Sequence, residues 1–205
     1  MRLPASSVVG YSFTMFRLVL LAALQVGQPI TAADTAPDLS IVIDLAANRL
    51  DLVEAGKVIA RYPVATGLPA YPTPVGTFLI RSVELNPSWT PPASPWAAGR
   101  KPMPPGPANP MGRAKMMLMP QYYLHGTPDS LSLGTAASHG CIRMHNRDVV
   151  DLARQVIEAG APALADSAAL LVADPVRSRT VRLERAVRVE VRYDAVPVAP
   201  LIPSP

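Results

Sequence analysis

The stretch Ser138-His139-Gly140-Cys141-Ile142-Arg143-Met144 carries the strongest signal in this sequence. It contains the only Cys of the chain, so an internal disulfide is excluded and the thiol is a buried small hydrophobe, a metal ligand or a nucleophile. A second stretch, Leu124-His125-Gly126-Thr127, places a histidine sixteen residues before that Cys. Two histidines and one thiol this close together favour a nucleophilic site.

A thiol attacks a carbonyl carbon efficiently as the thiolate, and a nearby imidazole can accept its proton. We expect His125 to be this base, because a turn between two strand ends can bring residues sixteen positions apart face to face. His139 lies only two residues before Cys141 and cannot easily fold back onto its sulfur. Gly140 has no side chain, which leaves main-chain N–H groups free to approach an oxyanion. Arg143 could hold a substrate carboxylate or pair with an acid of the following helix.

These two stretches, with their spacing and the Asn146 that follows, resemble the signature of the L,D-transpeptidase (YkuD-type) catalytic domain. Segments 64–67, 73–78 and 86–92 are similar to segments of the same family, and the likeness covers about 38–160. The resemblance implies a mainly β fold: a sandwich or barrel-like catalytic domain with one or two short helices and a Pro-rich lid loop.

Within this family the matching positions imply that Cys141 is the nucleophile and His125 the general base. The residues implied for the oxyanion and substrate side are Ser138, His139, Gly140, Gly126 and Arg143. No cofactor and no metal is implied. A zinc site is the alternative, since imidazole and thiolate are zinc ligands, but the spacing matches no common zinc pattern. His145 is expected to pack at the surface or at the start of a helix.

The resemblance implies an enzyme that acts on peptidoglycan stem peptides. Cys141 would attack a stem tetrapeptide, release the terminal D-Ala and form a thioester, which an amine acceptor resolves to give a 3→3 cross-link. The acceptor would be a second stem or an amine of a wall or outer-membrane protein. If water resolves the thioester, the same site is an L,D-carboxypeptidase or endopeptidase. A wall-binding module without turnover is a third class, and the oligomeric state is left open.

The amino terminus is typical of a secretory signal. Arg17 precedes the apolar run 18–26, which is too short to span a bilayer, and small residues follow at 31–33. We expect 1–33 to be removed and the protein to reach the periplasm or cell envelope; an uncleaved anchor is the alternative. Met15 would begin a more compact signal.

Strand patterns alternate with turn signals through most of the remaining chain. Strands are expected over 40–45, 49–54, 58–67, 77–83, 114–119, 122–124, 180–183 and 187–193, and helices over 146–157, capped by Asn146, and around 167–172. The predicted domains are the catalytic domain 38–175, a C-terminal strand extension 176–196 and a flexible tail 197–205.

The segment 87–110 contains nine prolines and both tryptophans, Trp89 and Trp96. No central strand tolerates that many prolines. A plain linker rarely carries large aromatic side chains, which must bury or bind something, so we favour an ordered loop over a site.

Composition argues for a folded protein that does not bind nucleic acid. Hydrophobic residues make up 49% of the chain and charged residues 17%, unlike a disordered chain. Two of the four net positive charges come from Arg2 and Arg17 in the predicted signal, so the remaining chain is only weakly basic.

Overall fold

The structure is a computed structural model that describes residues 38–175 and 177–193. The signal predicted over 1–33 and the tail predicted over 197–205 lie outside these residues. Within the described part of the chain, no helix is both long and apolar enough to cross a membrane.

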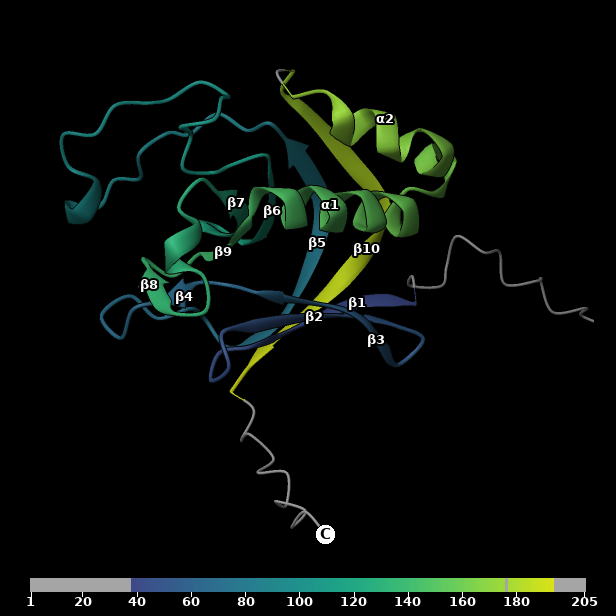
Figure 1. The fold of residues 1–205 in the computed structure, drawn as a ribbon, viewed down its shortest axis with the longest axis horizontal. Helices are drawn as coiled ribbons and strands as arrows, with labels where there is room; N and C mark the ends of the chain where they lie inside the picture. The colour runs from purple at the N-terminus through teal and green to yellow at the C-terminus, as the bar shows by residue number, and fades with distance from the viewer. Residues whose placement is uncertain (1–37, 176, 194–205) are drawn as a thin grey trace, which may run out of the picture. The chain divides into compact units, whose positions relative to one another are not determined.

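An eight-stranded sheet organises the described residues (Figure 1). Its strands lie in the order β3-β2-β1-β10-β5-β6-β7-β9, and a small second sheet pairs β4 with β8. β1 with β10 and β7 with β9 are parallel, and the other neighbours in the large sheet are antiparallel. The bounds are β1 Leu39–Asp44, β2 Arg49–Glu54, β3 Lys57–Pro63, β4 Thr66–Gly67, β5 Gly76–Leu85, β6 Ala114–Met119, β7 Tyr122–Thr127, β8 Ala136–Ser138, β9 Ile142–His145 and β10 Arg179–Arg192.

The two ends of this sheet meet, so the sheet is nearly closed. Ala65, which follows β3, and Arg143 of β9 exchange two main-chain hydrogen bonds of 2.9 Å. The sequence-based prediction of a mainly β, barrel-like fold with short helices is therefore confirmed.

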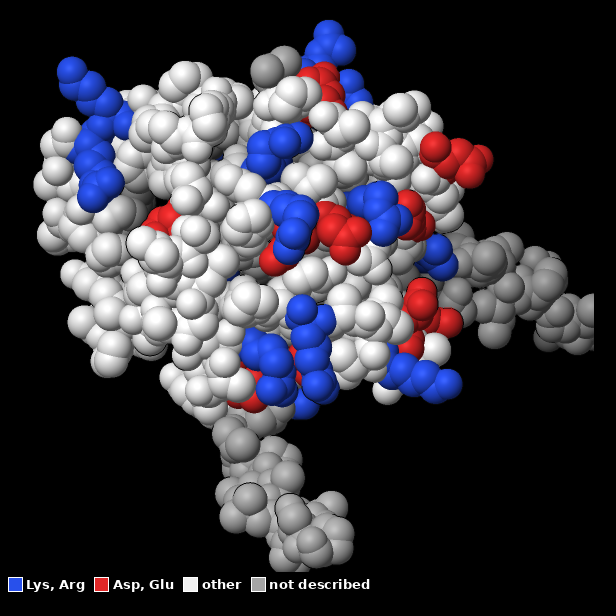
Figure 2. All heavy atoms as spheres, viewed as in Figure 1, with Lys and Arg blue, Asp and Glu red and all other residues white. Residues whose placement is uncertain are grey.

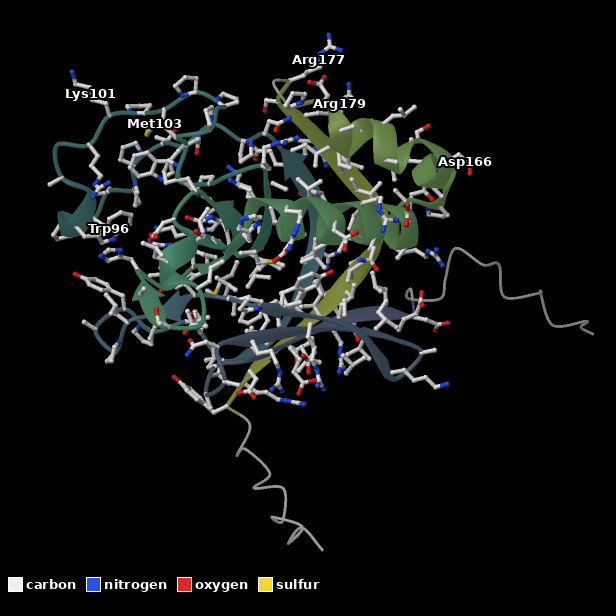
Figure 3. The ribbon with its side chains drawn as sticks, viewed as in Figure 1. Trp96, Lys101, Met103, Asp166, Arg177 and Arg179 are labelled. Atoms are coloured by element: carbon white, nitrogen blue, oxygen red, sulfur yellow. The ribbon has the colours of Figure 1, made fainter. Side chains whose placement is uncertain are left out.

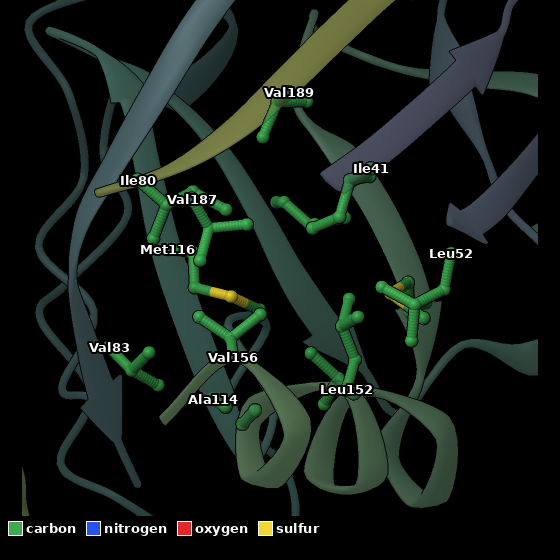
Figure 4. Packing of buried hydrophobic residues seen from close by; sticks show 14 of the residues in the cluster. Ile41, Leu52, Ile80, Val83, Ala114, Met116, Leu152, Val156, Val187 and Val189 are labelled. Atoms are coloured by element: carbon green, nitrogen blue, oxygen red, sulfur yellow. The ribbon is translucent and has the colours of Figure 1, made fainter. Parts of the chain in front are cut away.

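Helix α1, Asn146–Gly160, packs against one face of the sheet and builds the core with it (Figure 4). Its apolar residues recur at the three- and four-residue spacing of an amphipathic helix. Leu152 and Val156 are fully buried and belong to the same core cluster as Met116 of β6 and Ile80 of β5. Each buried side chain of this size contributes roughly 1.5–3 kcal/mol. A 3₁₀ turn, Pro162–Ser167, leads into the short helix α2, Ala168–Ala173, as the sequence predicted.

The prediction that Asn146 caps α1 is wrong by one residue. The N-cap is His145, whose Nδ1 accepts a hydrogen bond of 3.1 Å from the Arg147 N–H. The Asn146 side chain instead accepts a hydrogen bond from the main-chain N–H of Arg113. His145 therefore packs at the start of the helix, as expected.

The last strand differs from the two separate strands that the sequence predicted. A single strand, β10, lies between β1 and β5 and shifts register between Arg182 and Val187. Within the extra residues, Arg185 donates to the Ala159 carbonyl near the end of α1. The irregularity interrupts the alternation of the strand, which is why the sequence suggested two strands. The segment expected as an extension thus supplies an interior strand of the sheet.

The segment 87–110, called the Pro-rich loop below, has a defined structure (Figure 3). Trp89 and Met103 exchange main-chain hydrogen bonds of 2.9 and 2.8 Å, and a 3₁₀ turn covers Pro95–Ala97. Asn109 is 1% exposed, and its amide donates to the carbonyls of Pro87, Met103 and Pro104. The linker interpretation is therefore wrong, because one buried side chain ties both ends of this loop together.

Replacing Asn109 with Ala should lower the free energy of unfolding by about 1–3 kcal/mol, because buried carbonyl groups lose their donor. Limited proteolysis and urea unfolding measure the effect. The exposed Lys101→Ala change in the same loop is the control and should stay within about 0.5 kcal/mol. Equal stability of the two variants would contradict this role of Asn109.

Candidate active site

The pairing of β7 with β9 places the predicted catalytic residues. Leu124 lies beside Ile142, and His125 lies beside Arg143. Because side chains alternate along a strand, His125 and Arg143 share one face of the sheet. Cys141 lies two residues before Arg143, directly ahead of β9. Cys141 lies one strand across and two residues along from His125, which corresponds to a Cα–Cα separation of about 8 Å in regular strands. The thiol and the imidazole can bridge that spacing.

Four hydrogen bonds shape the turn that carries Cys141. Fully buried Ser138 donates to the Cys141 carbonyl at 2.5 Å and accepts from the Gly140 N–H at 3.0 Å. The Gly140 carbonyl accepts from Thr73 Oγ1 at 3.0 Å, and the Ser138 carbonyl accepts from the Leu68 N–H at 2.9 Å. The main chain on both sides of the sulfur is therefore held in place.

Gly140 cannot be replaced in this turn without strain. Its φ of +102° lies in the region that glycine tolerates best. A Cβ at this position would lie 2.6 Å from the ring of Tyr122. The sequence predicted that Gly140 leaves main-chain N–H groups free for an oxyanion, but its own N–H is engaged by Ser138. Its part in oxyanion binding stays a prediction.

The Cys141 thiol is half-buried and uncharged at rest. Its Sγ donates to the Gln121 carbonyl at 3.6 Å. Burial raises the pKa of the thiol, while a main-chain hydrogen bond from Tyr123 and the positive charge of Arg143 oppose the shift. Proton removal must therefore accompany attack on a substrate.

His125 is a buried neutral base. Burial lowers the pKa of its imidazole to about 4; the hydrogen bond to Gly126 opposes this shift, and the charges of Arg143 and Lys115 add to it. Nδ1 lies 2.7 Å from the Gly126 carbonyl, which can only accept, so Nδ1 carries the proton. The lone pair of the neutral ring is then on Nε2.

Comparisons with known proteins identify the family of this chain. The family model for the YkuD L,D-transpeptidase catalytic domain matches residues 38–177. The chain belongs to this family. It is 32% identical over 153 residues to the putative L,D-transpeptidase YkuD of Bacillus subtilis, covering 67% of this chain and 81% of that protein. It is 37% identical over 121 residues to the Bacillus licheniformis protein of the same name, covering 58% of this chain and 61% of that protein.

The fold of this L,D-transpeptidase family member also resembles a solved structure. The catalytic domain of the Enterococcus faecium L,D-transpeptidase matches with a TM-score of 0.50 at 18% identity, over 76% of this chain and 98% of that one. This likeness concerns the fold alone.

His139 lies in an aromatic stack at the site of this L,D-transpeptidase family member. Its ring is parallel to that of Trp96 in the Pro-rich loop, with centroids 4.2 Å apart, and tilted against Tyr71 at 4.8 Å. Burial, with the charges of Arg143 and Arg100, lowers the pKa of His139. This contact places Trp96 of the Pro-rich loop against His139, and the function of the loop as a cover of the site stays a prediction.

The charge of Arg143 acts on the Cys141 thiol, and the residues that the structure describes give Arg143 no acidic partner. Among the described residues, none makes an ion pair or side-chain hydrogen bond with its guanidinium. The basic and acidic side chains of α1 instead pair with one another, as Arg154 does with Asp151 and Glu158, and Figure 2 shows both signs interspersed over that helix. The expected alternative of an ion pair between Arg143 and the helix is therefore not seen in the described residues.

The zinc alternative finds no support in the histidine contacts. His125 faces Gly126, His139 stacks on Trp96, and His145 caps α1. No cluster of three or more potential metal ligands occurs among residues 38–175 and 177–193.

Three residues that hold the site were not identified from the sequence. Thr73, Gln121 and Tyr122 contact the turn around Cys141 from distant segments. Pro120 before Gln121 signals a turn, and Gln121 has a φ of +72°. That signal could have located the turn, but its approach to the sulfur depends on the sheet.

The free energy of unfolding should fall as the pH is lowered through the range in which the His125 imidazole binds a proton. The unfolded imidazole binds a proton near pH 6.5, while the folded one does so only near pH 4. Stability from the neutral ring is therefore present above about pH 6.5 and is lost on the way to about pH 4, by a total on the order of 3 kcal/mol.

Urea unfolding across this range measures the slope, and His125→Asn should flatten it. His145→Ala is the control, since His145 lies at the helix N-terminus rather than in the core. An unchanged slope in His125→Asn would contradict the buried neutral imidazole.

Proposed function

We propose that this chain is an exported L,D-transpeptidase that acts on peptidoglycan stem peptides through a Cys141 thioester. The observation that carries the proposal is the position of Cys141 two residues before Arg143, the strand partner of His125, whose imidazole is buried and neutral. Membership of the family supports the reaction class. The signal-like segment 1–33 supports export to the periplasm or cell envelope.

In the first half of the reaction, Cys141 Sγ attacks the carbonyl carbon of the third residue of a stem tetrapeptide. His125 Nε2 takes the thiol proton as the C–S bond forms. When the tetrahedral intermediate collapses, the C–N bond breaks and His125 returns the proton to the leaving amine of D-Ala. The product is an acyl thioester on Cys141.

In the second half, the side-chain amine of an acceptor stem attacks the thioester carbonyl. His125 now takes a proton from the amine, the C–S bond breaks, and the thiolate recovers the proton. The new amide is a 3→3 cross-link. An amine of a wall or outer-membrane protein would enter the same way, whereas water would give hydrolysis.

Main-chain and cationic groups around the sulfur would stabilise the charges of the reaction. The Gly140 N–H is engaged by Ser138, so we assign oxyanion binding to the N–H of Cys141 itself. Arg143 is suited to a stem carboxylate, because its guanidinium lacks an acidic partner in the described residues and lies on the face of His125. His139 and Gly126 would border the same site.

Intact-mass analysis with a tetrapeptide muropeptide tests the nucleophile. The wild-type protein should gain the mass of the donor less D-Ala, while Cys141→Ala should gain none and keep its thermal unfolding midpoint. A folded Cys141→Ala protein that retains full turnover would end the proposal. Adding an amine acceptor distinguishes hydrolysis of the thioester from transfer to the amine. A hydrolase releases only the tripeptide product, whereas a transpeptidase forms the cross-linked product.

Acylation should alter the fluorescence of Trp96 if the Pro-rich loop acts as a lid. The Trp89→Phe variant reports Trp96 alone, whose stack on His139 would open to admit a substrate. The Trp96→Phe variant, which keeps the buried Trp89, is the matched control and should show a smaller change. Identical spectra before and after acylation in Trp89→Phe would argue for a static loop.

A further inference from the structure

Asn146 follows the catalytic turn, yet the proposed reaction gives it no part. Its side chain is not the helix cap, because His145 holds that position. Asn146 Oδ1 accepts a hydrogen bond of 2.9 Å from the main-chain N–H of Arg113, just beyond the Pro-rich loop. An amide side chain directed away from its own helix at this point calls for another explanation.

The second observation is a tight contact between two glycines beside this amide. Gly112 has a φ of +62°, and a Cβ there would collide with the main chain of Gly126 and with Asn146 Oδ1. A Cβ at Gly126 would lie 2.5 Å from Asn146 Oδ1 and 2.8 Å from Val149 Cγ1. The Gly126 peptide is thus confined between α1 on one side and the segment after the Pro-rich loop on the other.

Gly126 matters because its carbonyl accepts the Nδ1–H of His125 at 2.7 Å. That hydrogen bond selects which ring nitrogen carries the proton and fixes the orientation of the imidazole. His125 is 4% exposed, so water has little access to replace the carbonyl. Any group that fixes the Gly126 peptide therefore also fixes the base.

We propose that Asn146 is a positioning residue for His125: it fixes the Gly126 peptide and, through Arg113, joins the base to the end of the Pro-rich loop. This proposal rests on the proposed function, since it assigns Asn146 to the same reaction. Asn146 touches neither substrate nor sulfur in this scheme. A movement of the loop end would reach His125 through the Asn146 amide and the two glycines.

The test compares Asn146→Ala with Asn146→Asp, which keeps an acceptor oxygen, and with His145→Ala, which removes the neighbouring helix cap. Acylation of Cys141 by a carbapenem, a strained amide, is followed by intact mass at neutral pH. We expect Asn146→Ala to react about tenfold more slowly, a part of the roughly 10²–10⁴-fold that a positioned base contributes. Asn146→Asp should recover most of the rate, and His145→Ala should react as the wild type does.

Alkylation by iodoacetamide from about pH 6 to about pH 10 supplies a readout that a merely structural role would not change. At high pH the thiolate forms without a base. The defect of Asn146→Ala should therefore shrink as the pH rises. The other charged groups near His125, Arg143 of β9 and Lys115 of β6, are the same in every variant.

Three results would overturn the proposal: a wild-type acylation rate in Asn146→Ala, a defect that His145→Ala shares at every pH, or no recovery in Asn146→Asp. If Asn146→Ala does not fold, the comparison of Asn146→Asp with Asn146→Leu in the same assays decides. Failure of the proposed function itself looks different, because the wild-type protein would then form no acyl adduct on Cys141 with the carbapenem, although iodoacetamide would still alkylate the thiol.

Discussion

The register between β7 and β9 is the constraint on which the rest of the structure depends. Parallel strands cannot be joined by a tight turn, so the chain between them runs through 128–141 and brings Cys141 back beside β7. Alternation then places Leu124 and His125 on opposite faces of the sheet. Leu124 and His125 are both buried, so a slip of one residue would place the imidazole in the apolar core and the leucine on the face of Arg143. The apolar core that contains Leu124 therefore also decides which face of the sheet carries His125.

The candidate site contains an uncharged thiol and an uncharged imidazole, and hydrogen bonds to main-chain atoms hold its turn in place. Burial raises the pKa of Cys141 and lowers that of His125, so the resting pair is a thiol and a neutral imidazole. A buried ion pair would carry a large desolvation penalty, which this arrangement avoids. Ser138 and Thr73 hold the turn through main-chain atoms, and Gly140 allows the turn to pass close to an aromatic ring. The small side chains of Ser138 and Thr73, together with Gly140, thus set the position of the Cys141 thiol.

The Pro-rich loop has an ordered structure and contacts the residues around the candidate site. Prolines limit the freedom of the unfolded segment, and buried Asn109 joins its two ends, so a long connection without regular strands keeps one structure. Trp96 brings the loop onto His139, while the chain just after the loop meets Asn146. The Pro-rich loop therefore contacts His139 through Trp96, and the chain that follows the loop contacts Asn146.

Local patterns in the sequence determined the β class, the span of α1 and the ordered loop, and they predicted the Cys141–His125 pair, because alternation, helical spacing and a short motif are properties of neighbouring residues. The tertiary structure alone decided that β10 lies inside the sheet and that Asn146 contacts Arg113 rather than its own helix. It also decided the direction of each pKa shift. These features depend on which distant segments meet, and strand order and burial are set by the closure of the whole sheet, which no local pattern encodes.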